Sequence, residues 1–213
     1  PRDGSFLCLK WGPGVPGIRE KGGHACWAFG SADGQRWRPL LDRPVYHDHD
    51  SFGLTWDEAT GRFIVFQATY QTWHKPYPDN AGPDTRRVMH FRTSPDGVHW
   101  TPAYDIARLG RHAPVARLLT PDRHDTPELE FYRFFGFPYG DRWAGMMLHY
   151  CPSPRCVEPQ NLHGPHNGAE WWIGRDPLHW KRPFRETFAP GHAPWIIAHP
   201  PITLGGRHLW VMG

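Results

Sequence analysis

The stretch "SPDGVHW", residues 94–100, has a near copy at residues 31–37, "SADGQRW", and a diverged copy at residues 174–180, "GRDPLHW". Asp-Gly favours a tight turn, because Asp can hydrogen-bond to its own backbone and Gly accepts a positive φ. β-prone segments flank the central copy, "RRVMHFRT" before it and "WTPAYDIARL" after it. Each copy, called a box below, therefore predicts a hairpin turn. Trp37, Trp100 and Trp180 are expected to occupy equivalent positions.

Further hairpins lie between the boxes. "SFGLTW" and "RFIVFQATY" flank the turn "DEATG", and "LEFYRFFGF" and "RWAGMMLHY" flank the turn "PYGD". After the third box, "WIIAHPPITL" and "RHLWVMG" flank "GG". The repeating unit is thus four strands: a hairpin, a long loop, and a hairpin that carries a box. A proline follows each box Trp by two or three residues (Pro39, Pro102 and Pro183), which favours edge strands there.

Four-stranded antiparallel units in series are the blades of a β-propeller. We therefore predict an all-β fold, a β-propeller of four-stranded antiparallel blades, with residues 1–213 as a single domain. A β-sandwich with common turns is the alternative. The strand pattern supplies part of one blade, two complete blades and the first hairpin of another, so we expect a fragment of a ring, which needs roughly four to eight blades. The 23 glycines and 24 prolines agree with many turns and few long helices.

Composition and charge narrow the possible partners. The net charge is only +3 and Lys and Arg form no block, so a nucleic-acid partner is not predicted. A membrane partner is not predicted either, because there is no run of about 18 apolar residues.

The cysteine pair in "CPSPRC", residues 151–156, could form a disulfide, or all four cysteines could be reduced. Cysteine and histidine spacing gives no zinc site, and no cofactor is predicted. The 12 tryptophans either fill contacts between sheets or form a stacking platform for a sugar.

Three segments carry a resemblance to a known class of proteins: "DSFGLTWDEATGRFIVFQATYQTW", "TRRVMHFRTSPDGVHWT" and "TPELEFYRFFGFPYGDRWAGMMLHY". They resemble the five-bladed propellers of the invertase and arabinanase class of glycoside hydrolases. The chain looks most like bacterial proteins described as similar to the N-terminal domain of the invertase family. The resemblance implies five blades when the ring is complete, a carbohydrate substrate and hydrolysis of glycosidic bonds. The boxes also resemble the Asp-boxes of sialidases, but they are one residue short of that spacing.

In the resembled enzymes, three carboxylates meet in a central funnel, one from an early strand of each of three successive blades. Asp50 precedes "SFGLTW", and Asp125, Glu128 and Glu130 precede "FYRFFGF". The resemblance places Glu130 at the position of the acid and Asp50 at that of a carboxylate that supports an oxocarbenium-like centre. Asp125 is the next catalytic candidate. The alternatives are a turn or capping role for Asp50 and a surface strand position for Glu130.

The invertase family also carries an Arg-Asp-Pro motif, and this chain has "RDP" at residues 175–177. These letters lie in the turn of the third box, whereas the family's motif lies on a funnel strand, so we assign no catalytic role to Asp176. No "NDPNG"-like stretch is present, and the carboxylate of the first blade is expected upstream of Pro1. The last hairpin has only His192 and His199 where a carboxylate is expected.

The remaining candidates bind substrate. His49, Trp73 and Tyr132 are predicted to contact the sugar. The "HDHD" stretch, residues 47–50, could ligate a metal, because alternating histidines on a strand share a face, but a polar loop lining a sugar pocket is favoured and no metal site is predicted. Arg86 and Arg87 could reach the funnel, but we expect them to be solvated on their strand. Two functional alternatives stay open: a phosphorolytic relative and a non-catalytic sugar-binding or scaffold propeller.

Overall fold

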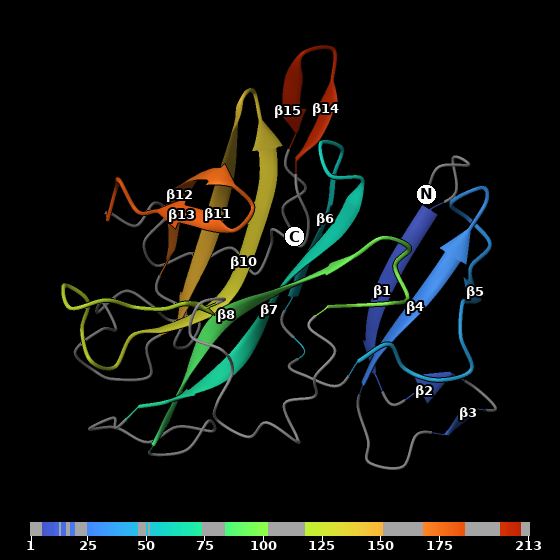
Figure 1. Ribbon diagram of the computed structural model, residues 1–213, viewed down its shortest axis with the longest axis horizontal. Coiled ribbons are helices and arrows are strands. Elements are labelled where there is room, and N and C mark those ends of the chain that lie inside the picture. Colours follow the sequence, from blue (N-terminus) through green and yellow to red (C-terminus); the bar gives the residue numbers. More distant parts are fainter. Residues whose placement is uncertain are drawn as a thin grey trace.

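The computed structural model describes residues 6–12, 14–15, 18–19, 25–46, 50, 52–73, 84–101, 118–150, 168–185 and 201–209. The structure in these ranges is all strands and turns (Figure 1). The strands are β1 (Phe6–Gly12), β2 (Gly14–Val15), β3 (Ile18–Arg19), β4 (Ala25–Ser31), β5 (Arg38–Pro39), β6 (Phe52–Asp57), β7 (Arg62–Thr72), β8 (Thr85–Ser94), β9 (Leu118–Leu119), β10 (Glu130–Tyr139), β11 (Arg142–Tyr150), β12 (Ala169–Asp176), β13 (His179–Lys181), β14 (Ile202–Leu204) and β15 (Arg207–Leu209). No helix in the described part of the chain is long and apolar enough to cross a membrane.

The strands form three successive antiparallel sheets and two short hairpins. The first sheet has the order β1-β4-β5, the second β6-β7-β8-β9 and the third β10-β11-β12-β13. The hairpins are β2-β3 and β14-β15. In Figure 1 the second sheet lies between the first and the third, as the middle blade of a series must. The prediction of four-stranded antiparallel units is confirmed for the second and third sheets.

The three boxes form the same kind of turn. Trp37 and Trp100 each donate an indole N–H bond to the carbonyl of the box glycine, Gly34 and Gly97, over 3.1 and 2.9 Å. Trp180 donates the corresponding bond to Pro177, over 2.8 Å. The residues that flank each turn pair in one register, namely Gly30 with Arg38, Thr93 with Thr101, and Ile173 with Lys181. The predicted equivalence of the three tryptophans is thus supported by their bonds and by their register.

Side-chain bonds explain the residue types in the first two boxes. Asp96 Oδ1 accepts bonds from the backbone N–H groups of Val98 and His99, and the Ser94 hydroxyl bonds to the same oxygen. Ser31 and Asp33 make the matching set in the first box. Gly97 has a φ of 83°, a conformation that favours glycine. These aspartates fix turns, as predicted, and their oxygens are used for that purpose.

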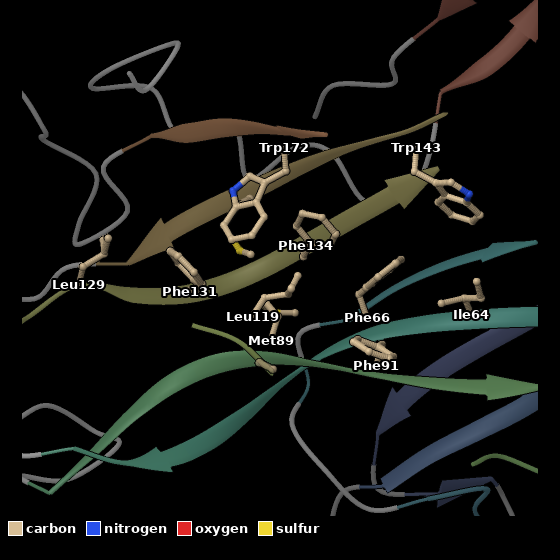
Figure 2. Close-up of a cluster of buried hydrophobic side chains, with 12 residues drawn as sticks. Ile64, Phe66, Met89, Phe91, Leu119, Leu129, Phe131, Phe134, Trp143 and Trp172 are labelled. Carbon is tan, nitrogen blue, oxygen red and sulfur yellow. The ribbon is translucent and has the colours of Figure 1, made fainter. Parts of the chain in front are cut away.

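Two apolar layers hold the sheets together. Between the second and third sheets, Phe66 from β7 meets Phe134 from β10 edge to face, with ring centroids 4.9 Å apart. Figure 2 shows this layer, with side chains of β7 and β8 facing those of β10, β11 and β12. The second layer lies between the first and second sheets and includes Leu9, Val65 and Trp100. Both faces of the second sheet are therefore buried, so β7 and β8 are buried in long runs in which buried and exposed residues do not alternate.

The first strands of the second and third sheets approach closely. A Cβ atom added to Gly53 of β6 would lie 2.5 Å from the Phe134 carbonyl oxygen of β10, so only glycine fits there. This contact sets β6 beside β10 at the shared edge of the two sheets. Two predicted catalytic candidates lie at these strand starts: Asp50 just before β6, and Glu130 as the first residue of β10.

The box tryptophans differ in burial, and this gives a matched pair for mutagenesis. Trp100 is 5% exposed, and Trp37 is 42% exposed. We expect Trp100→Phe to lower the free energy of unfolding by about 1–3 kcal/mol, because it leaves the buried Gly97 carbonyl without its donor and loses packing. Trp37→Phe should cost less than about 1 kcal/mol. Urea denaturation of both variants tests this, and equal losses would contradict it.

Candidate functional site

The candidate site lies where β6 and β10 begin. Asp50 comes two residues before β6, and Glu130 is the first residue of β10. Asp50 is exposed, whereas Glu130 is completely buried. Tyr132 is the third residue of β10, and the pKa of its hydroxyl is raised, first by burial and then by the negative charge of Asp50. Asp50 and Glu130 thus lie at the starts of the first strands of successive sheets, while their convergence on one pocket stays a prediction.

Glu130 is paired with an arginine from the neighbouring sheet. Arg87 Nη1 of β8 lies 2.6 Å from Glu130 Oε2. The side chains are 3% and 0% exposed, so the pair is shielded from bulk solvent. The expectation that Arg86 and Arg87 are solvated on their strand was wrong: they are 5% and 3% exposed. In a strand covered on both faces, an arginine has no solvent side to reach, so it must find a partner inside the protein.

Three tyrosine rings surround this ion pair. The Arg87 guanidinium carbon lies 4.8 Å from the ring centre of Tyr150, 5.8 Å from that of Tyr132 and 5.9 Å from that of Tyr70. Tyr132 and Tyr150 are stacked, with centroids 5.6 Å apart and ring planes 22° apart. All three tyrosines are only partly buried, so the cluster reaches the surface. Sequence reasoning named Tyr132, and it named Arg87 only as a residue that could reach the funnel. It did not name Tyr70 or Tyr150, because their partners are distant in the chain.

A second aromatic contact lies nearby. Trp73, 38% exposed, donates its indole N–H to the Pro127 carbonyl over 2.9 Å. The Arg86 guanidinium lies over its ring at 3.9 Å from the centroid and bonds to Gln71 Oε1. Burial lowers the pKa of Arg86 to about 10, although the charges of Asp125 and Glu130 act to raise it. Arg86 covers the face of Trp73 on which it lies, so any sugar that stacks there must use the other face.

Asp125 belongs to a separate ion-pair network. Its two oxygens accept bonds of 2.5 and 2.9 Å from Arg182, which follows the third box. Arg182 also binds both oxygens of Glu170 on β12, at 2.6 and 2.7 Å. His149 Nε2 of β11 lies 3.1 Å from Glu170 Oε2. Because both Asp125 oxygens are used by Arg182, this carboxylate fixes the loop before β10, and it is not included in the catalytic pair proposed below.

This network predicts how stability depends on pH. Burial acts to raise the pKa of Glu170, but the bonds and charges of Arg182 and His149 together outweigh it, and the pKa lies below its ordinary value of 4.5. A carboxyl whose pKa is lower in the folded state stabilises the fold above its unfolded pKa, and this is lost as pH falls through the folded value. We therefore expect the free energy of unfolding to decline as pH falls below about 4.5. Urea titrations at stepwise lower pH test this; stability that rises over that range would contradict it.

Only some of the remaining predicted residues lie within the described ranges. His49 lies outside the described residues, and of the "HDHD" stretch the structure describes Asp50 alone. In the part of the chain that is described, no group of three or more His, Cys, Asp or Glu side chains could hold a metal ion. Cys151 and Cys156, the proposed disulfide partners, also lie outside the described ranges. Asp176 lies in the third box turn and accepts the Leu178 N–H bond, as expected of a turn residue.

The sequence matches no known protein family, and no curated protein matches it. Solved structures, however, share its arrangement of sheets. The chain superposes on a Bombyx mori GH32 β-fructofuranosidase in complex with sucrose, with a TM-score of 0.57, 13% identity and 98% of this chain covered. The fold is part of a β-propeller.

Two further structures support this conclusion. A complex of BT0996 with RGII aligns with a TM-score of 0.55 and 12% identity, and a protein described as a glycoside hydrolase with 0.52 and 11%; each match covers 95% of this chain. The chain spans 38% of the length of the β-fructofuranosidase and 56% of each of the other two. At these identities the likeness concerns the fold, and it agrees with the all-β propeller predicted from the boxes.

Proposed function

We propose that this chain forms part of a carbohydrate-active propeller that hydrolyses glycosidic bonds, with Asp50 and Glu130 as paired carboxylates. The observation that carries the proposal is the cluster at the start of β6 and β10. There Asp50 lies just before β6, Gly53 of β6 packs against the Phe134 carbonyl of β10, and the Tyr132 ring lies beside the Arg87–Glu130 pair. Two carboxylates at the starts of neighbouring strands, with aromatic rings beside the Arg87–Glu130 pair, suit a sugar ring and a bond to be cleaved.

Hydrolysis of a glycosidic bond requires water and the two proposed carboxylates. Water adds across the glycosidic C–O bond: its hydroxyl goes to the anomeric carbon and its proton to the departing oxygen. A carboxylate stabilises the positive charge that develops at the anomeric carbon, and the partly exposed rings of Tyr132 and Trp73 offer stacking for a sugar. The solved neighbours support the substrate class, since one is named a β-fructofuranosidase and was solved with sucrose.

The resemblance to invertase-type propellers further suggests a ring of five blades, of which the described residues supply three sheets and two short hairpins. On this proposal residues 1–213 belong to one domain. His49, Trp73 and Tyr132 are the proposed substrate contacts, and carbohydrate is the proposed partner.

Incubation with a panel of aryl glycosides and with sucrose tests this function. We expect release of reducing sugar or aryl alcohol that falls strongly in Asp50→Asn. Asp141→Asn is the matched control, because Asp141 is 90% exposed in the β10–β11 turn. Sugar binding by calorimetry without turnover would favour the non-catalytic binding module. Neither binding nor turnover on any member of the panel would overturn the proposal.

One observation favours the phosphorolytic alternative enough to test it. Arg86, Arg87 and Arg133 gather around the cluster, and the charges of Arg87 and Arg133 both act on Tyr132. Arginine groups can hold phosphate, which would replace water as the attacking group. Turnover should then require inorganic phosphate and yield a sugar phosphate, whereas hydrolysis proceeds equally in phosphate-free buffer.

A further inference from the structure

Arg87 and Glu130 form a closed unit inside the protein. The two residues are 43 positions apart and come from different sheets, yet Nη1 and Oε2 are 2.6 Å apart and both side chains are almost without exposure. Removing a carboxylate from water is costly unless an opposite charge and hydrogen bonds compensate for it. Glu130 has that compensation in Arg87.

The strand register places a tyrosine beside each member of the Arg87–Glu130 pair. Arg87 of β8 is paired with Tyr70 of β7, and Glu130 of β10 is paired with Tyr150 of β11. The guanidinium therefore meets the tyrosine beside it and the tyrosine beside its partner, with Tyr132 as a third ring. Aromatic faces attract a cation, so the rings stabilise the charge on Arg87 and restrict where its planar group can lie.

We propose that Arg87 is a positioning residue that holds Glu130 fixed and ionised, so that Glu130 acts as the charged carboxylate of the site and not as its proton donor. The role of Glu130 as the charged carboxylate rests on the function proposed above. This role differs from that of proton donor, which the sequence resemblance implies for Glu130.

The physical reason lies in the requirements of a proton donor. A general acid must hold its proton near the working pH, which enzymes achieve by placing a carboxyl in apolar surroundings or beside another carboxylate. Glu130 is buried, but its nearest charged neighbour is a cation at hydrogen-bonding distance. A cation within about 4–6 Å favours the ionised carboxylate by roughly one to three pH units. A fixed negative charge suits the stabilisation of a developing oxocarbenium ion.

The first test needs no substrate. The carboxyl carbon of Glu130, assigned by its loss in Glu130→Gln, is followed by ¹³C NMR during a pH titration of wild type, Arg87→Met and Arg87→Lys. We expect the midpoint to move up by about one to three pH units in Arg87→Met and to be largely restored in Arg87→Lys. Arg92→Met is the matched control, since Arg92 is also buried on β8 over a tyrosine ring and should leave the midpoint unchanged. An unchanged midpoint in Arg87→Met would overturn the proposal.

Arg87→Met could fail to fold, because it leaves the buried Glu130 carboxylate without its counter-charge. In that case thermal melts of the double variant Arg87→Met, Glu130→Gln replace the titration. The double variant should melt higher than Arg87→Met alone, since the uncompensated charge is gone. A double variant that melts lower would contradict the assignment of Arg87 as the partner that keeps Glu130 charged.

The second test addresses the role in the reaction. We compare kcat/KM of wild type and Glu130→Gln on two glycosides of one sugar, with a dinitrophenyl and a methyl leaving group. Loss of a charged carboxylate should reduce kcat/KM by similar factors on both. Loss of a proton donor would spare the dinitrophenyl substrate, which leaves without protonation, and this would overturn the proposal. If wild type cleaves nothing, the proposed function fails, while the NMR titration still decides whether Arg87 governs the charge of Glu130.

Discussion

Arg182→Met is expected to lower the free energy of unfolding by about 3–5 kcal/mol, as found when one partner of a buried ion pair is removed. Arg182 is 6% exposed, and its partners Asp125 and Glu170 are 8% and 0% exposed. The substitution would leave two carboxylates without their shared cation. It would also remove the guanidinium that packs over Phe131 and Trp172.

Arg185 offers a control a few residues further along. It pairs with Asp122 over 2.5 Å, but both side chains are 40% exposed. Solvent screens such a pair, so Arg185→Met should cost no more than about 1 kcal/mol. Urea denaturation at neutral pH compares the two variants. Equal small losses in the free energy of unfolding would show that the Arg182 network stabilises the fold no more than a surface ion pair does.

The Arg182 network has a consequence for the candidate site. Asp125 lies in the loop that enters β10, and Arg182 ties that loop to Glu170 on β12. Glu130 begins the strand directly after this loop. Arg182 thus fixes the backbone ahead of Glu130, while Arg87 fixes its side chain. The start of β10 is therefore held by an ion-pair network within the third sheet and by an ion pair with β8 of the second sheet.

The fold could be predicted because its signals are local. Each box encodes its turn within seven residues, through an Asp or Ser side chain that accepts bonds from backbone N–H groups of the same turn. The hairpins between boxes follow from short turn sequences between apolar segments. The β2–β3 hairpin was not predicted, because its strands are only two residues long and carry no alternation.

The site was harder to predict because its partners are remote. The pattern "TRRVMHF" suggests arginines facing solvent, since one sequence does not show that both faces of β8 are covered. Glu130 was found because it precedes an apolar strand, but its partner Arg87 lies 43 residues earlier on another sheet. Nor does the sequence separate Asp125 from Glu130 by role; the bidentate bonds from Arg182 do.

Glu130→Gln is expected to reduce kcat on any glycoside that the protein cleaves by roughly 10²–10⁴-fold, the usual effect of removing one charged or proton-transferring group from a site. The sequence alone suggests that this nearly isosteric change leaves stability intact. The structure changes that expectation, because the substitution leaves the buried Arg87 without its counter-charge. A loss of up to about 3–5 kcal/mol should accompany it, reduced where the amide oxygen still accepts the Arg87 bond.

Activity and stability must therefore be separated in this experiment. Turnover is measured well below the melting midpoint and divided by the folded fraction from circular dichroism, with the exposed Asp141→Asn as control. If corrected kcat falls at least a hundredfold, Glu130 acts on the substrate. If the entire deficit disappears on correction, Glu130 serves only to neutralise Arg87. The carboxylates of the reaction would then be sought at Asp50 and at the neighbouring buried Glu128, because the start of β10 would supply no other.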